Sequence, residues 1–213
     1  MAEEKFDFSI DSLGPCTIPS PIKLSTEHGD YTANYVSDDS YVISNVNVYD
    51  KTKPVVLDSS NLIEKAGPRQ NIYFDPTHAK AGICTCGGLC PGLNDVIRAI
   101  VRCLNTRYGV KTVKGYQFGF HGFFAESGYA PIELDRYLID EIHKIGGTYL
   151  GTSRGGGQRV SEIVDCLERD GINMLFIIGG DGTQRGSYDI ACEVEKRGLK
   201  CAVVGVPKTV DII

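Results

Sequence analysis

A short glycine-rich turn with one carboxylate follows a strongly apolar stretch of the chain. Gly179–Thr183 reads Gly-Gly-Asp-Gly-Thr and comes directly after Met174–Ile178, which reads Met-Leu-Phe-Ile-Ile. Glycines let backbone N–H groups approach phosphate oxygens closely, and an aspartate among them is a ligand for Mg²⁺ or for its water shell. The pattern therefore predicts a phosphate and metal site in this turn, with Asp181 as the carboxylate.

Two further glycine-rich loops have the composition of ligand sites. Thr85–Asn94 reads Thr-Cys-Gly-Gly-Leu-Cys-Pro-Gly-Leu-Asn, follows a short apolar strand and opens an amphipathic helix. Gly146–Gly157 reads Gly-Gly-Thr-Tyr-Leu-Gly-Thr-Ser-Arg-Gly-Gly-Gly and is too polar for a core. We expect both loops, called here the first turn (Thr85–Asn94) and the third loop (Gly146–Gly157), to contact the same ligand as Gly179–Thr183.

The elements that must position these loops alternate between strand and helix from about residue 80 onward. We expect strands at 81–86, 111–116, 174–178 and 201–206, and helices at 94–107, 134–145, 160–170 and 182–197. Such alternation predicts an α/β fold, a parallel sheet with helices on both faces. Ligands bind such sheets beyond the carboxyl ends of the strands, so the three loops are predicted to form one site.

The first part of the chain has a different character. Residues 1–77 contain several prolines and polar clusters, with short strand-like pieces at 41–43 and 46–48. We interpret 1–77 as an irregular N-terminal extension and 78–213 as the ligand-binding domain.

Composition restricts the classes of partner. The 213-residue chain has a net charge of −5 and a pI near 5.4, with no basic stripe, so nucleic acid and anionic membranes are not expected partners. The acidic start has no apolar core and no apolar run reaches the roughly 18 residues of a membrane span, so we predict a soluble, cytoplasmic protein.

The eight cysteines are interpreted mainly as free thiols. Five of them lie in apolar strand or helix patterns, where a thiol behaves as a small hydrophobe: Cys84, Cys103, Cys166, Cys192 and Cys201. Cys86 and Cys90 flank a glycine turn, but no second cysteine pair completes a tetrahedral zinc site.

The glycine loops and one further segment together resemble a known family. Thr85–Asn94, Gly151–Gly155, Gly179–Thr183 and the terminal Pro207-Lys208-Thr209-Val210-Asp211 are similar, in order, to the motifs of the phosphofructokinases. They resemble most the branch with a long N-terminus found in plants and some microbes. The resemblance implies a Rossmann-like N-terminal lobe and phosphoryl transfer from ATP, with Mg²⁺, to the 1-hydroxyl of fructose 6-phosphate.

The resemblance also implies roles for single residues in the donor site, where positioning and charge neutralisation dominate phosphoryl transfer. Asp181 would hold the metal. Residues implied to bind the nucleotide are Gly87, Gly88, Arg154, Gly155, Gly180, Asp181, Gly182 and Thr183. Structural alternatives exist: the glycines can serve a turn, Arg154 can be a solvated surface charge, and Asp181 can cap a helix.

Gly182 bears on the identity of the donor. Family members that use pyrophosphate usually carry aspartate at this position, whose charge opposes the α-phosphate of a nucleotide, whereas ATP users carry glycine. Lys208 is shared between pyrophosphate users and this ATP-using branch. Gly182 therefore favours ATP as the phosphoryl donor, and pyrophosphate stays the alternative donor.

The acceptor site is implied at the end of the chain. Lys208, Thr209, Val210 and Asp211 would lie at the sugar, with Asp211 as the general base that takes the proton of the attacking hydroxyl. The family pattern continues Asp-Asn-Asp, but here Ile212 and Ile213 follow. A second half of the family's proteins holds the sugar 6-phosphate, so we expect this chain to be the nucleotide-binding half, truncated, of a homo-oligomeric (dimeric or tetrameric) enzyme.

Other readings of the same motifs remain open. NAD kinases and lipid kinases share the Gly-Gly-Asp-Gly-Thr turn but lack the Cys86–Asn94 turn and the Pro-Lys-Thr segment. A non-catalytic, nucleotide-binding regulatory module would pair with an intact subunit. An unstable fragment would expose the apolar strand that ends near Val206.

Overall fold

The computed structural model describes residues 7–27, 29–30, 32–46, 52 and 57–210. The chain divides into two compact units, Met1–Tyr73 and Phe74–Ile213. All three glycine-rich loops belong to the second unit.

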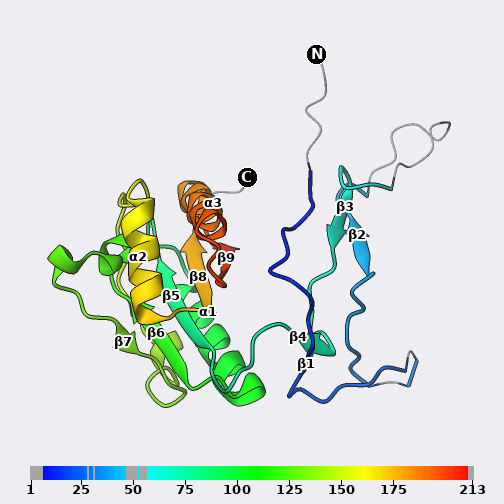
Figure 1. Cartoon of the computed structure of the whole chain (residues 1–213). Coiled ribbons are helices and arrows are strands. Elements are labelled where there is room, and N and C mark those ends of the chain that lie inside the picture. The colour runs from blue at the N-terminus through cyan, green and yellow to red at the C-terminus, as the bar shows by residue number, and fades with distance from the viewer. Residues whose placement is uncertain (1–6, 28, 31, 47–51, 53–56, 211–213) are drawn as a thin grey trace. The chain divides into compact units, whose positions relative to one another are not determined.

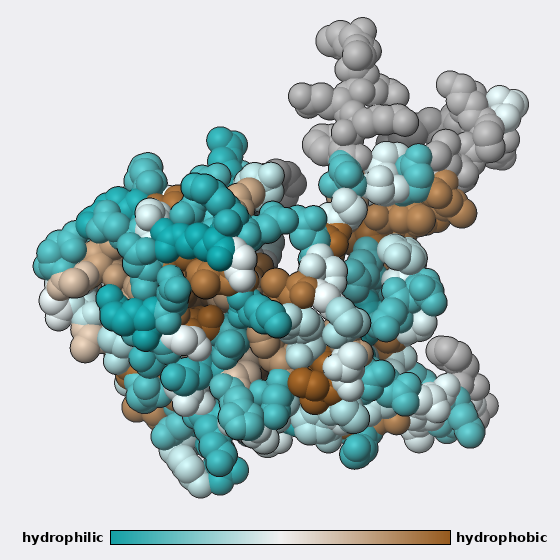
Figure 2. Space-filling view, viewed as in Figure 1, coloured by the Kyte–Doolittle hydropathy of each residue, from teal (hydrophilic) through white to brown (hydrophobic). Residues whose placement is uncertain are grey.

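The first unit contains two small antiparallel ribbons. β1 (Ile18–Pro19) pairs with β4 (Asn71–Ile72), and β2 (Tyr41–Ile43) pairs with β3 (Leu62–Glu64). The expected strand at 41–43 is confirmed, whereas most of the one at 46–48 lies outside the described residues. All three residues of β2 are exposed, and apolar surface gathers over this strand (Figure 2).

The second unit is built on a five-stranded sheet with the order β7-β6-β5-β8-β9. Its strands are β5 (Lys80–Thr85), β6 (Thr112–Tyr116), β7 (Ile132–Glu133), β8 (Met174–Gly179) and β9 (Ala202–Pro207). The four longer strands pair in parallel, as predicted, but the short edge strand β7 runs antiparallel to β6 and was not predicted.

Helices cover both faces of this sheet, as the alternating pattern predicted (Figure 1). α1 (Leu93–Arg102) lies on one face, and α2 (Val160–Asp170) and α3 (Asp181–Lys196) lie on the other. Successive residues of a strand point to opposite faces, so β5 contributes Ile83 to the core under α1 and Cys84 to the core under α2 and α3.

Short helices of other types fill the connections. α1 continues into a π-helical turn, Cys103–Tyr108, so the helix expected over 94–107 changes type after Arg102. Three 3₁₀ helices follow: η2 (Gly119–Phe123), η3 (Ala125–Ser127) and η4 (Ile142–Lys144).

The helix expected over 134–145 is wrong. Only η4 is helical there, and the burial of the apolar side chains fits no α-helical face, since Ile139 is buried while Leu138 is 41% and Ile145 is 60% exposed. The Asp135 carboxylate accepts the N–H groups of Tyr137 and Leu138, both at 2.8 Å. Such a local turn satisfies backbone donors without an α-helix.

The cysteine predictions hold in part. Cys84, Cys166 and Cys201 are buried free thiols, but Cys192 is exposed on α3 and Cys103 is half-buried. Within the ranges that the structure describes, no helix is long and apolar enough to cross a membrane.

A largely buried polar cluster connects the end of α2 to the sheet. The Tyr116 hydroxyl, fully buried, donates to Asp170 Oδ2 at 2.9 Å, and Lys114 Nζ lies 3.2 Å from the same oxygen. Burial acts to raise the pKa of Asp170, but the hydrogen bonds from Tyr116 and Lys114 and the nearby cations outweigh it, so the carboxyl pKa lies below its usual value.

We predict that Asp170→Asn lowers the free energy of unfolding at pH 7 by about 1–3 kcal/mol, because Tyr116 and Lys114 lose a half-buried carboxylate. A lowered pKa contributes stability that is complete above the unfolded-chain pKa, about 3.9, and is lost as pH falls through the lower folded value. The difference between wild type and variant should therefore shrink below about pH 4.

Urea unfolding followed by circular dichroism at pH 7 and at lower pH measures this difference. Asp165→Asn, on the same helix, is the matched control, since Asp165 is 61% exposed and pairs at the surface with Arg197. Exposed pairs contribute about 0–1 kcal/mol, so equal effects of the two substitutions would contradict the assignment.

Candidate functional site

One cavity lies at the carboxyl ends of the parallel strands. It has a volume of about 650 Å³ and is lined by all three glycine-rich loops and by the segment after β9. The strand that follows β5 in the chain, β6, lies on one side of β5, whereas the later strand β8 lies on its other side. The strand order therefore reverses at β5, next to this cavity. Ligand sites in open α/β sheets occur at this reversal.

Nearly all the predicted site residues line this cavity. They are Gly87, Gly88, Arg154, Gly155, Gly180, Asp181, Gly182, Thr183, Lys208, Thr209 and Val210. Asp211, the predicted general base, lies outside the described residues together with Ile212 and Ile213.

The first turn is anchored to its neighbours by backbone hydrogen bonds. Cys86 N–H donates to the Ile178 carbonyl at 2.8 Å, and Gly87 N–H donates to the Ser153 carbonyl at 2.9 Å. Gly87 also adopts a left-handed backbone, with φ of 88°. Because the Gly87 N–H already donates to Ser153, the N–H of the neighbouring Gly88 is the better candidate to donate a hydrogen bond to a phosphate oxygen.

The N-terminus of α3 opens directly onto the cavity. Gly180 is the N-cap and offers no side-chain cap, while Thr183 N–H and Gln184 N–H both donate to the Gly180 carbonyl. Asp181 is thus the first helical residue rather than the cap. The N–H groups of Asp181 and Gly182 have no partner four residues earlier in the helix, and this geometry is suited to an anion.

Glycine is required where β8 meets α3. A Cβ on Gly179 would lie 2.5 Å from Thr183 Oγ1 and 2.6 Å from the Cys86 carbonyl. A Cβ on Gly182 would meet nothing within 4 Å. The first glycine allows the turns after β5 and β8 to touch, and the second leaves space for a ligand.

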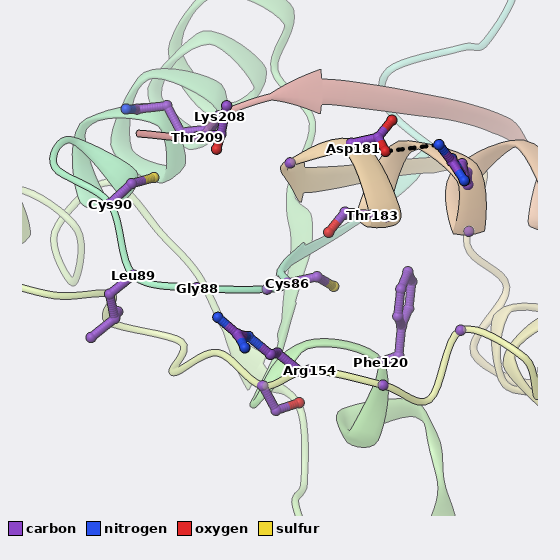
Figure 3. A pocket seen from close by; sticks show the side chains of 18 of the residues that line it. Cys86, Gly88, Leu89, Cys90, Phe120, Arg154, Asp181, Thr183, Lys208 and Thr209 are labelled. Carbon is purple, nitrogen blue, oxygen red and sulfur yellow. Dashed lines mark ion pairs between the residues drawn. The ribbon is translucent and has the colours of Figure 1, made fainter. Parts of the chain in front are cut away.

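The cavity is positively charged although the chain is acidic. Its lining carries three cations, Arg154, Arg185 and Lys208, and two carboxylates, Asp181 and Asp189. Figure 3 shows Arg154 pointing toward Gly88 from the third loop. Among the described residues, Arg154 has no ion-pair partner, so its guanidinium is available to an anion.

Asp181 is placed to hold a cation together with ligand oxygens. It is 68% exposed, and among the described residues its one ion-pair partner is Arg185, at 3.0 Å; exposed pairs of this kind are weak. No group of three or more His, Cys, Asp or Glu side chains able to hold a metal occurs in the part of the chain that the structure describes. A single exposed carboxylate fits Mg²⁺, which keeps several waters and is bound by one or two carboxylates together with phosphate oxygens of the ligand.

An apolar wall of the cavity was missed by sequence reasoning. Phe120, from η2, lies against glycines of two other elements, because a Cβ on Gly157 or on Gly186 would lie 3.3 Å or 3.2 Å from its ring. In Figure 3 its ring stands beside α3, away from Arg154. The cavity therefore has a charged end and an apolar end, where Gly157 and Gly186 cover the buried Phe120 ring. Only its flanking glycines set Phe120 apart in the sequence.

The segment after β9 closes the cavity on another side. Lys208 N–H donates to the Gly179 carbonyl at 2.9 Å, and its side chain passes over the first turn, within 3.5 Å of a Cβ built on Gly92. A Cβ on Gly180 would lie 3.5 Å from Thr209. Val210 is 69% exposed.

A buried amide aligns the first and third loops. Asn94, in the first turn of α1, donates to the Ile142 and Ile145 carbonyls at 3.0 and 2.9 Å and accepts the Tyr149 N–H at 2.6 Å. The side chain is 3% exposed. Its three partners precede the Gly151–Gly155 stretch, so Asn94 fixes where that loop begins.

Comparisons with known proteins agree on one family. The model of the phosphofructokinase family matches residues 80–212. An ATP-dependent 6-phosphofructokinase of Borreliella burgdorferi is 51% identical over 98% of this chain, and ATP-dependent 6-phosphofructokinase 1 of Arabidopsis thaliana is 42% identical over 96% of it. This chain spans 46% and 41% of the length of these two relatives.

Solved structures show the same fold at low sequence identity. A pyrophosphate-dependent phosphofructokinase of Nitrosospira multiformis matches 62% of this chain, and 34% of its own, with a TM-score of 0.55 and 18% identity. Phosphofructokinase of Pichia pastoris matches 70% of this chain, and 18% of its own, with a TM-score of 0.55 and 23% identity. Some relatives from Arabidopsis are named chloroplastic, so the cytoplasmic location stays a prediction.

We predict that Gly179→Ala lowers the free energy of unfolding by about 1–3 kcal/mol, because its Cβ overlaps the Cys86 carbonyl and Thr183. Gly182→Ala is the matched control and should change stability by less than about 1 kcal/mol, since open space surrounds that Cβ and alanine favours helix. Thermal and urea unfolding compare the two. Equal destabilisation would contradict the close approach of the two turns.

Proposed function

This chain belongs to the phosphofructokinase family, and we propose that its residues 78–213 form the lobe that binds ATP and Mg²⁺ in a kinase acting on fructose 6-phosphate. In this proposal the γ-phosphoryl group of ATP is transferred to the 1-hydroxyl of the sugar, giving fructose 1,6-bisphosphate. The relatives that span nearly all of this chain are named ATP-dependent 6-phosphofructokinases.

The observation that carries the proposal is the cavity itself. It combines a helix N-terminus, the Gly88 amide, three cations and the exposed Asp181 at its charged end with Gly157 and Gly186, packed on the Phe120 ring, at its apolar end. The charged end suits a chain of phosphates with Mg²⁺, and the apolar end suits a purine base. Mg²⁺, when bound to Asp181, would neutralise the phosphate charge.

The acceptor would bind on the side formed by Lys208, Thr209 and Val210. The Lys208 ammonium group can offset negative charge that develops during transfer, and the Thr209 hydroxyl can contact the sugar. The role of Asp211 as general base stays a prediction. Self-association into dimers or tetramers, which the family resemblance implies, also stays a prediction.

Phosphorylation of fructose 6-phosphate by the purified chain tests the proposal directly. ATP and pyrophosphate should be supplied in parallel with Mg²⁺, and nucleotide binding should be measured by calorimetry in the same preparation. Turnover with ATP supports the full proposal. Binding of ATP without turnover supports the lobe alone, as in a regulatory module, and absence of ATP binding contradicts both.

We predict that Asp181→Asn weakens the binding of Mg·ATP by about 10- to 100-fold, because a charge-assisted metal contact is lost. Removing Mg²⁺ should weaken ATP binding to wild type but have little further effect on the variant. Calorimetric titration with and without EDTA measures both.

Asp189→Asn is the control for Asp181→Asn, since Asp189 lines the same cavity from further along α3. Removing its charge should leave Mg·ATP affinity unchanged or slightly higher. An Asp181 variant that binds ATP with an unaltered Mg²⁺ dependence would contradict the metal role.

We predict that Gly182→Asp weakens ATP binding by at least about tenfold and pyrophosphate binding much less, since the added carboxylate enters open space and opposes the α-phosphate. Competition between the two ligands at constant Mg²⁺ measures the ratio. Gly182→Asn has a similar volume without the charge and should weaken ATP less. Parallel losses for ATP and pyrophosphate would contradict this account of donor choice.

A further inference from the structure

Phe118 has an unusual backbone for a residue that does not line the cavity. Its φ and ψ are 55° and 44°, which is the left-handed region, and no other non-glycine residue within the described ranges has a positive φ. Bulky side chains are disfavoured there, and such strain persists only where surrounding contacts enforce it. The contacts around Phe118 should therefore show what the strain maintains.

Both backbone groups of Phe118 bind the third glycine loop. Its N–H donates to the Leu150 carbonyl at 2.8 Å, and its carbonyl accepts the Ser153 hydroxyl at 2.6 Å. These bonds grip the loop at two points on either side of Gly151. A residue at position 118 with an ordinary strand backbone would direct these two groups differently.

The Phe118 ring makes a further contact with this loop. A Cβ built on Gly151 would lie 2.7 Å from the ring, so the ring lies directly on this glycine, which itself has φ of 67°. The Tyr129 ring packs against Phe118, with 4.4 Å between centroids. Phe118 nevertheless remains 37% exposed, so burial alone gives a weak reason for its position.

The loop that Phe118 contacts is hydrogen-bonded directly to the first turn, at the charged end of the cavity. The Thr152 hydroxyl donates to the Gly87 carbonyl at 2.9 Å, and the Ser153 carbonyl accepts the Gly87 N–H at 2.9 Å. Arg154 follows at once and points toward Gly88 (Figure 3). A displacement of Gly151–Ser153 would therefore move the guanidinium.

We propose that Phe118 is a positioning residue for phosphate recognition: it holds Leu150–Ser153 in place and thereby directs Arg154 into the cavity. The inference rests on the proposed function, because it assigns Arg154 to the phosphates of the ligand. Phe118 touches neither the cavity nor a ligand and acts only through the loop.

Phe118→Gly is the most informative variant, since glycine adopts the left-handed backbone without strain and the chain should still fold. Binding of Mg·ATP, inorganic triphosphate and adenosine should be measured by NMR titration. We expect affinity for ATP and for triphosphate to fall about tenfold, the scale of one charged contact, with affinity for adenosine unchanged. A uniform loss for all three ligands would overturn the proposal.

A double-mutant cycle tests whether Phe118 acts through Arg154. The double variant Phe118→Gly, Arg154→Ala should bind triphosphate no more weakly than Arg154→Ala alone, because the guanidinium that Phe118 positions is already absent. Full additivity of the two losses would overturn the proposal.

Two matched variants separate positioning from stability. Phe118→Tyr keeps the ring and should bind triphosphate as wild type does. Phe123→Leu changes an aromatic residue of the adjoining η2, which stacks on Tyr116 with 4.1 Å between centroids, and should lower the melting temperature without altering the ratio of triphosphate to adenosine affinity. A shift in that ratio for Phe123→Leu would overturn the proposal.

Hydrogen exchange distinguishes failure of this inference from failure of the proposed function. The amides of 150–154 should exchange faster in Phe118→Gly than in wild type, without any ligand present. Unchanged exchange would overturn the grip even if wild type binds ATP. Absence of triphosphate binding to wild type would instead overturn the proposed function.

Discussion

The parallel pairing of β5 with β8 is the constraint on which the rest of the site depends. Thr85 lies opposite Ile178, and the pairing continues as Cys86 N–H donates to the Ile178 carbonyl. Both strands therefore end at the same level, and the two glycine turns that follow meet side by side. Gly179 allows that meeting, since any larger residue would overlap the turn after β5.

From this junction the local charge of the site follows. The start of α3 directs the N–H groups of Asp181 and Gly182 into the cavity, and three cations from separate elements converge on the same space. An acidic chain thereby gains a locally cationic cavity. The phosphate recognition proposed for this cavity would depend on the positions of a few local charges and not on the net charge of the chain.

Two residues that do not line the cavity fix the positions of its loops. Asn94 fixes the beginning of the third loop through three hydrogen bonds, and Phe118 holds the middle of that loop by its backbone and its ring. The loop in turn binds the first turn at Gly87. The three loops thus form one connected unit, which can present several groups to a ligand with little loss of entropy on binding.

The sequence by itself determined the four parallel strands, the helices on both faces and the convergence of the three glycine loops, because strong apolar periodicity and glycine turns act locally. Only the tertiary structure decided the remainder. At 134–145 the apolar spacing looks helical, but the turn at Asp135 and packing in the core give a different structure. β7 has only two residues, which is too short for a recognisable pattern. Phe118, Phe120 and the occupied N–H of Gly87 acquire their roles from partners more than 30 residues away in the chain. Contacts of that kind leave no periodic signal in the sequence, since they exist only once the sheet has brought its strand ends together.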